Sequence, residues 1–222
     1  MNALLHYQSA LLLRSQRWLA PVILYAAFLA VGVQSGQPVL DSLAYAAAAL
    51  LPVAAWMVRI CVTNEPPAAR SCAAAATGPW RAQLACLLSA FLASAAFGAV
   101  ATLAVAVISD PASTDHRTAV NRIAAGGAGL LAMLVSALLG TAIGAATSRP
   151  LLRSPGRAIP AMLLASLLAL VTTGSPAKAA LTGLVTGSRD GAVPVLLLPV
   201  AGAALLAVAA VGAACGLASR RG

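Results

Sequence analysis

The sequence predicts an all-α integral membrane protein with six transmembrane helices in a single transmembrane domain over residues 1–222. Hydrophobic residues make up 61% of the chain and charged residues only 9%, whereas a soluble domain carries about 25% charged residues. The mean hydropathy is +0.92. Apolar segments near the length of about 20 residues that crosses a bilayer recur along the chain. Much of the apolar content is alanine, which favours close helix packing.

Six apolar segments are candidate spans, at residues 18–34, 39–61, 82–108, 123–146, 158–174 and 192–218. The first and fifth are short for a hydrocarbon core of about 30 Å, so their flanking residues must contribute or these helices must stand nearly upright. The third and sixth are long enough to tilt. Two pairs with GxxxG spacing, Gly140–Gly144 and Gly212–Gly216, support close helix packing without locating the packed face.

The basic residues between these segments predict the orientation. With the N-terminus in the cytoplasm, ten of the 14 lysines and arginines fall inside. The four outside are Arg117, Arg122, Lys178 and Arg189. The positive-inside rule therefore predicts a multi-pass protein of the plasma membrane with both termini cytoplasmic.

Residues 1–17 predict an amphipathic helix that lies on the cytoplasmic surface before the first span. The apolar face and the closing arginines are formed by Leu4, Leu5, Leu11, Leu12, Arg14 and Arg17. Trp18 follows as an interfacial anchor. A cytoplasmic extension of the first span is the alternative.

The stretch VTNEPPAARSCAAAATGPWRAQ, residues 62–83, predicts a short cytoplasmic helix between the second and third spans. Asn64 can cap a helix, Glu65 favours the first turn, and the following prolines are tolerated only near a helix start. Gly78 and Pro79 then end the helix. The predicted helix covers residues 66–77.

A second semi-apolar segment, residues 175–188, is too short to span. Ser175 can cap it, Pro176 suits its first turn, and Gly187 can stop it. Such a segment either sits in the extracellular interface or re-enters the membrane.

No catalytic motif is present in the sequence. It lacks a phosphate-binding loop and both common hydrolase motifs, and its four cysteines form no CxxC pair. The two histidines lie in the N-terminal segment and in an outer loop, and the spans lack buried ionisable residues. We therefore expect no enzyme, no cofactor and no metal in this chain. The dispersed arginines also exclude nucleic-acid binding as their purpose. Energy for any transport would come from another subunit.

The sequence resembles the permease subunit of a type-2 ABC exporter (the ABC-2 family), in particular the small alanine-rich kind of actinobacteria. The stretch NEPPAAR…AAAATGPWRAQLA carries most of the resemblance, together with the N-terminal helix and the segment between spans five and six. The resemblance implies a coupling helix at 64–77, a gating N-terminal helix at 2–17 and a re-entrant cap at 175–188. Unlike larger members, this chain has short outer loops.

The resemblance further implies partners and a docking site. The partners are an ABC ATPase subunit, which would bind ATP and Mg²⁺, a second permease copy or a paralogous permease, and membrane lipid. The ATPase-docking residues would be Asn64, Glu65, Arg70, Trp80, Arg81, Arg149 and Arg153. Low charge and apolar walls suit a hydrophobic or amphipathic cargo.

Two alternatives stay open at this point. One is the substrate-binding membrane subunit of an energy-coupling-factor vitamin importer, which predicts polar groups around an outward pocket. The other is a non-transporting membrane scaffold, which demands little of the sequence.

Overall fold

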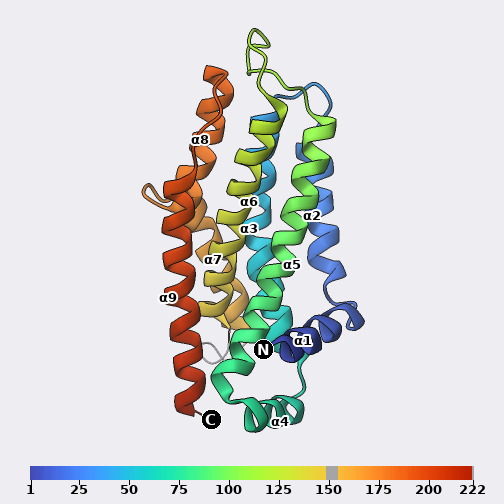
Figure 1. Ribbon diagram of the computed structural model, residues 1–222, viewed down its shortest axis with the longest axis vertical. Coiled ribbons are helices and arrows are strands. Elements are labelled where there is room, and N and C mark those ends of the chain that lie inside the picture. The colour runs from blue at the N-terminus through green and yellow to red at the C-terminus, as the bar shows by residue number, and fades with distance from the viewer. Residues whose placement is uncertain (149–154, 222) are drawn as a thin grey trace.

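The computed structural model describes residues 1–148 and 155–221, and within these ranges the chain forms helices and no strand. The helices are α1 (Asn2–Arg14), α2 (Leu19–Gly32), α3 (Val39–Asn64), α4 (Pro67–Thr77), α5 (Pro79–Ile108), α6 (Arg122–Thr147), α7 (Pro155–Val171), α8 (Pro176–Asp190) and α9 (Leu197–Arg221). The longer helices run side by side along one axis (Figure 1). The predicted all-helical class is confirmed for the described residues.

Four helices are long and apolar enough to cross a membrane, namely α3, α5, α6 and α9. The pair α7 and α8, bent by 46°, would provide a fifth crossing. The first predicted span, 18–34, corresponds to α2, which has 14 residues and a length of about 21 Å. The chain thus has the helices of a multi-pass membrane protein, and the count of six spans stays a prediction.

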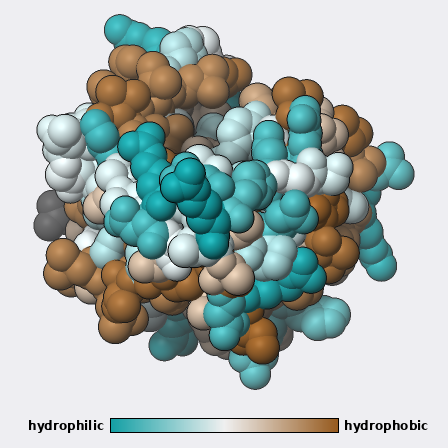
Figure 2. Space-filling model, turned by 90° about the horizontal axis from the view of Figure 1, so that it is seen from above, coloured by the Kyte–Doolittle hydropathy of each residue, from teal (hydrophilic) through white to brown (hydrophobic). Residues whose placement is uncertain are grey.

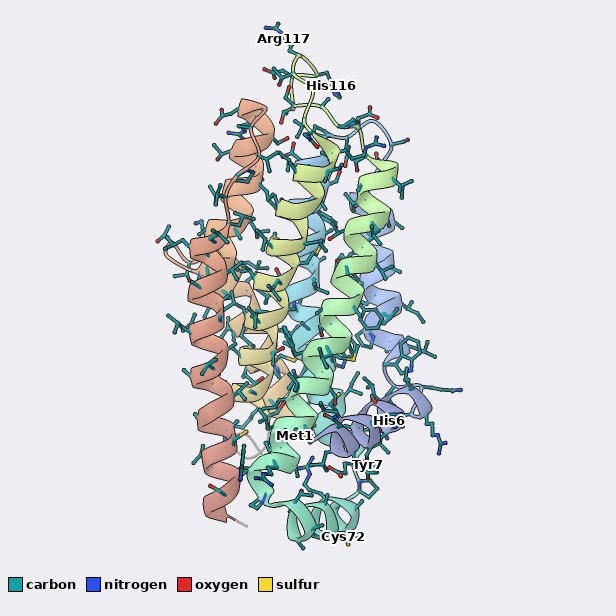
Figure 3. All side chains as sticks on the ribbon, in the orientation of Figure 1. Met1, His6, Tyr7, Cys72, His116 and Arg117 are labelled. Carbon is teal, nitrogen blue, oxygen red and sulfur yellow. The ribbon has the colours of Figure 1, made fainter. Side chains whose placement is uncertain are left out.

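The two ends of the bundle differ in structure. α1, α4 and the end of α9 lie together at one end, which we call the α4 end (Figure 1). The 109–121 loop lies at the other, the loop end, and carries His116 and Arg117 at its tip (Figure 3). Seen from the loop end, hydrophilic residues gather over the centre while hydrophobic residues occupy much of the rim (Figure 2). This pattern suits a bundle whose flanks face lipid.

α3 is the central helix, because its neighbours enclose it along most of its length. Its large side chains Leu43, Leu50, Leu51 and Met57 are fully buried. Helices α2, α5, α6 and α8 all pack against it. A helix whose surface is mostly covered by its neighbours needs no polar face, which fits the largely apolar sequence of α3.

Two glycines of α6 allow it to approach the α3 backbone closely. A Cβ atom added to Gly140 would lie 2.6 Å from the Leu51 carbonyl oxygen. One added to Gly144 would lie 2.6 Å from the Val58 Cβ and 2.9 Å from the Ala55 carbonyl oxygen. The first GxxxG pair therefore marks the α3–α6 contact, whereas a Cβ at Gly212 or Gly216 meets nothing within 4 Å.

The segment predicted at 175–188 folds into α8, which follows α7 after a bend of 46° and packs against α3 and α6. Whether it lies in the interface or re-enters the membrane stays open. The predicted cap is confirmed, because the Ser175 hydroxyl accepts a hydrogen bond of 3.3 Å from the Ala177 N–H. The predicted stop at Gly187 is wrong. That glycine lies against the Ala192 carbonyl oxygen with no room for a Cβ, and the helix ends at Gly191, which is left-handed with φ +66°.

The last predicted span, 192–218, begins later than expected. Residues 192–196 are non-helical, and α9 starts at Leu197. Pro194 has no N–H to donate, and Pro199 is tolerated in a helix only within its first turn. The two prolines thus place the start of α9 near residue 197.

We predict that Gly140→Ala destabilises the bundle by about 1–3 kcal/mol, because the added methyl group would press on backbone that cannot rotate away. Gly212→Ala is the matched control, since its methyl group enters open space and the helix gains propensity. Thermal unfolding in detergent, followed by circular dichroism, measures both. Equal melting temperatures for the two variants would contradict the assigned α3–α6 contact.

Candidate functional site

The helix predicted between the second and third spans is confirmed at nearly the predicted bounds, because α4 runs from Pro67 to Thr77 rather than from 66 to 77. Its cytoplasmic location stays a prediction. Pro67 occupies the first turn, and Gly78, with φ +92°, ends the helix immediately before α5 begins at Pro79. None of the α4 residues is buried. α4 is therefore a bounded helix that stands out from the α4 end of the bundle (Figure 1).

The predicted cap of α4 is wrong. Pro66 occupies the N-cap position, and no side chain caps the helix. Asn64 instead ends α3, and its side-chain amide donates a hydrogen bond of 3.1 Å to the Leu11 carbonyl oxygen of α1. The two consecutive prolines fix the start of α4 through their restricted φ angles, so a capping side chain is not needed.

Glu65 lies between α3 and α4 and is 7% exposed, so its carboxylate is inside the chain rather than on the surface. Its Oε2 atom accepts a hydrogen bond of 3.3 Å from the Gln8 side-chain amide of α1. The same oxygen lies 3.6 Å from the Arg70 Nε atom of α4. This is the one ion pair among the described residues. A single carboxylate thus joins α1, α4 and the end of α3.

Tyr7 and Asn64 complete the group that we call the Glu65 cluster. Its members are Tyr7, Gln8, Asn64, Glu65 and Arg70. The Arg70 guanidinium also donates to the Val62 carbonyl oxygen of α3. Partial desolvation raises the pKa of the Tyr7 phenol, and the negative charge of the nearby Glu65 raises it further, while the residue itself is 40% exposed.

Glu65 has no spare hydrogen bond that could replace a lost contact within the Glu65 cluster. The second carboxylate oxygen, Oε1, is buried without a hydrogen-bond partner in the described part of the chain. A buried charge that loses a partner costs more than an exposed one, because water cannot replace the contact. If α1 or α4 moves away from Glu65, the contact of the other helix with the carboxylate therefore changes as well.

The N-terminal helix predicted at 2–17 forms a separate helix, α1, which ends at Arg14 and packs against α3 and α5. Its gating role stays a prediction. Leu12 is buried among Met57, Cys61 and Cys86, and Leu4, Leu5 and Leu11 are half-buried. Arg14 and Arg17 are exposed. The Trp18 ring, predicted as an interfacial anchor, stacks on Phe97 of α5 at 6.4 Å between centroids.

Gln8 and Tyr7 are the members of the cluster that sequence reasoning missed. Gln8 is four residues from both Leu4 and Leu12, so it lies on the apolar face of α1. A polar side chain on a buried face needs a partner, and this was the available signal. The sequence could not tell which partner, because Glu65 lies 57 residues away.

The remaining predicted docking residues divide into two sets. Trp80 is 47% exposed, and the Arg81 guanidinium lies 5.3 Å from the centre of its ring. These two stand at the start of α5, next to α4, and are free to meet a partner. Arg149 and Arg153 lie outside the described residues.

Comparisons with known proteins give no match: no protein-family model, curated protein or solved structure corresponds to this chain. The likeness to ABC-2 permeases therefore stays a prediction from the sequence.

We predict that Glu65→Ala loosens α1 while leaving the bundle core intact, because it removes the acceptor of Gln8 and, with it, the counter-ion of Arg70. Hydrogen exchange followed by mass spectrometry should show the amides of residues 2–14 exchanging at least tenfold faster, with α6 unchanged. That factor corresponds to about 1.4 kcal/mol of lost protection, within the range for an unpaired buried group. Asp115→Ala, in the loop end, is the control, and unchanged α1 protection in Glu65→Ala would refute the joining role.

Proposed function

We propose that this chain is the transmembrane permease subunit of an ATP-driven transporter of the ABC-2 type. It would export a hydrophobic or amphipathic compound and draw energy from a separate ATPase subunit that docks at the α4 end. The observation that carries this proposal is α4, a bounded helix with no buried residue, joined to α1 through the Glu65 cluster.

A helix as short as α4 has a specific physical requirement. Isolated helices below about 12–15 residues are marginal in water, and α4 has 11 residues. It is joined to α3 by Glu65 and Pro66 and to α5 by Gly78 alone. Such short joints hold the helix in place without burying it. An ordered, exposed helix outside the apolar bundle is suited to contact a soluble protein.

The composition of the surface beside α4 supports the same proposal. Trp80 and Arg81 are exposed and lie together, and tryptophan and arginine are the residue types that most often dominate binding energy at protein interfaces. Arg149 and Arg153 belong to a neighbouring loop in the predicted topology. We assign these four residues to contact with the ATPase.

We propose a different role for three of the predicted docking residues, Asn64, Glu65 and Arg70. Because Glu65 is buried and Asn64 is engaged with α1, we assign them to transmission rather than to direct contact. A force applied to α4 reaches Glu65 through Arg70 and reaches α1 through Gln8. Such a chain of polar contacts is a physical route for coupling between two sites.

Co-purification in mild detergent with a nucleotide-binding subunit tests the proposal, followed by measurement of vanadate-sensitive ATP hydrolysis. We expect Trp80→Ala with Arg81→Ala to weaken the complex at least thirtyfold, the effect of losing about 2 kcal/mol at an interface. We expect Glu65→Gln to retain the complex but to lower cargo-stimulated hydrolysis, because the charge that holds Arg70 is lost.

Two results would contradict the proposal. One is that no nucleotide-binding subunit is retained while a small ligand co-purifies, which would favour a substrate-binding subunit of an importer. The other is that Glu65→Ala and Arg70→Ala leave both the complex and the coupling intact, which would remove the assigned route.

A further inference from the structure

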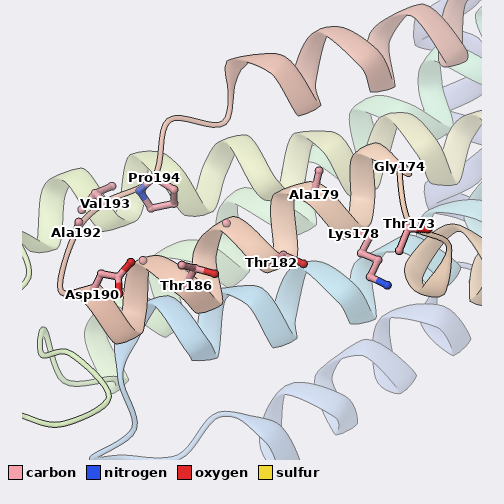
Figure 4. Close-up of a pocket in the computed structure, with 12 residues that line it drawn as sticks. Thr173, Gly174, Lys178, Ala179, Thr182, Thr186, Asp190, Ala192, Val193 and Pro194 are labelled. Atoms are coloured by element: carbon pink, nitrogen blue, oxygen red, sulfur yellow. The ribbon is translucent and has the colours of Figure 1, made fainter.

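A groove of about 600 Å³ runs along the outer side of α8, between the α7–α8 connection and the α8–α9 connection (Figure 4). One wall is α8 itself, and the other is formed by Ala192, Val193 and Pro194 of the non-helical segment that leads to α9. Ligand sites in proteins typically have volumes of about 300–1,000 Å³. The size alone therefore permits a ligand, and the lining decides which kind.

The α8 wall carries a polar stripe. Lys178, Thr182, Thr186 and Asp190 are spaced four residues apart and all line the groove. The opposite side of α8 is apolar and buried, with Ala177, Ala180 and Leu184 in the core. An amphipathic helix with its apolar side already in the core presents its polar side to water or to a ligand, since lipid would leave the hydroxyl and charged groups unpaired.

The second wall has a backbone group without a partner. Within residues 192–196, the Ala192 N–H donates to the Gly187 carbonyl oxygen, and the Leu196 carbonyl oxygen accepts from Val200. The N–H group of Val193, which lines the groove, has no acceptor in the described part of the chain. Non-helical backbone beside a bilayer is tolerated only where protein or water satisfies it. An extended chain can supply the missing partner by strand pairing.

The two ends of the groove carry opposite charges. Lys178 lies in the first turn of α8, and its Nζ atom donates a hydrogen bond of 2.8 Å to the Val171 carbonyl oxygen. A lysine ammonium has three donors, so two remain. Asp190 ends the same helix. Neither side chain forms an ion pair within the described residues. The dipole of α8 adds to the effect of these two charges, because it favours an anionic ligand group at the start of the helix, near Lys178, and a cationic one at its end, near Asp190.

We propose that this groove binds a linear peptide in an extended conformation, with its terminal carboxylate at Lys178 and its terminal amino group at Asp190. The two residues are 12 positions apart, which corresponds to about 18 Å along a helix. An extended peptide advances about 3.4 Å per residue, so about five residues fit between the two charges. The threonines of α8 meet its backbone, and Val193 and Pro194 meet small apolar side chains.

The charge separation distinguishes a peptide from a lipid. A zwitterionic lipid headgroup carries its two charges only a few ångströms apart, so it cannot reach Lys178 and Asp190 at once. A peptide with free ends carries one charge of each sign at the required separation. That the peptide is cargo rests on the proposed function, whereas its binding belongs to this chain alone.

Calorimetric titration of the purified chain, in phosphatidylcholine nanodiscs and without any ATPase, tests the inference. The probes are penta-alanine with free ends, the same peptide acetylated at its amino end, and the same peptide amidated at its carboxyl end. We expect each modification to raise the Kd at least fivefold.

Charge-removing variants assign each end of the peptide. Lys178→Gln should abolish the difference between free and amidated peptide while it keeps the preference for a free amino group. Asp190→Asn should do the reverse. Lys178→Arg keeps the positive charge and should keep the discrimination, which separates ligand binding from the contact with Val171. Arg189→Gln, next to Asp190 and exposed, is the control and should bind all three peptides as the unmodified chain does.

Three results would overturn the inference: equal affinity for the free and modified peptides, an equal effect of Arg189→Gln and Asp190→Asn, or no peptide binding with phospholipid retained in the groove. The last result would assign the groove to the membrane. None of them bears on whether an ATPase docks at α4, because that association is measured separately on residues at the other end of the bundle.

Discussion

The close contact between α3 and α6 is the constraint on which the remaining architecture depends. Gly140 and Gly144 let the α6 backbone lie against α3, and no larger residue fits there without displacing backbone. In lipid, where helices gain little from excluding water from one another, such close packing supplies much of the association energy. With α3 enclosed, α5 and α8 take up the positions beside it. The two ends of α3 then fix where the candidate sites lie.

Helix α3 thereby positions two different groups of polar residues, the Glu65 cluster at the α4 end and the groove along α8. At the α4 end, α3 finishes at Asn64 and Glu65, which hold α1 and α4. Farther from the α4 end, α3 packs against the buried side of α8. The polar groove therefore lies on the opposite side of α8. A displacement of α4 can therefore change the position of α1 without breaking the α3–α6 contact. This separation is the arrangement that the proposed function requires, with a partner at one end and a ligand held elsewhere.

Local signals predicted much of this fold, and contacts between distant segments account for most of what they missed. Pro67 and Gly78 delimit α4 through their own φ angles, and Ser175 caps α8 through its neighbour, so both features could be inferred from the sequence. The burial of Glu65 depends on α1 folding back from 57 residues away. Gly187 was predicted to stop a helix, but it is small because the return segment passes against it. The groove likewise needs α8 and residues 192–194 together.

The central proposal is that an ATPase docks on α4. The single cysteine of α4, Cys72, permits a direct measurement. Cys72 lies on α4 at the far end of the bundle (Figure 3) and is exposed, whereas Cys61, Cys86 and Cys215 are buried. A thiol-reactive photo-crosslinker attached to Cys72 in native membranes reports what lies against α4. The account predicts a crosslink to a nucleotide-binding subunit that is lost in Cys72→Ser. Crosslinks that never include such a subunit would contradict it.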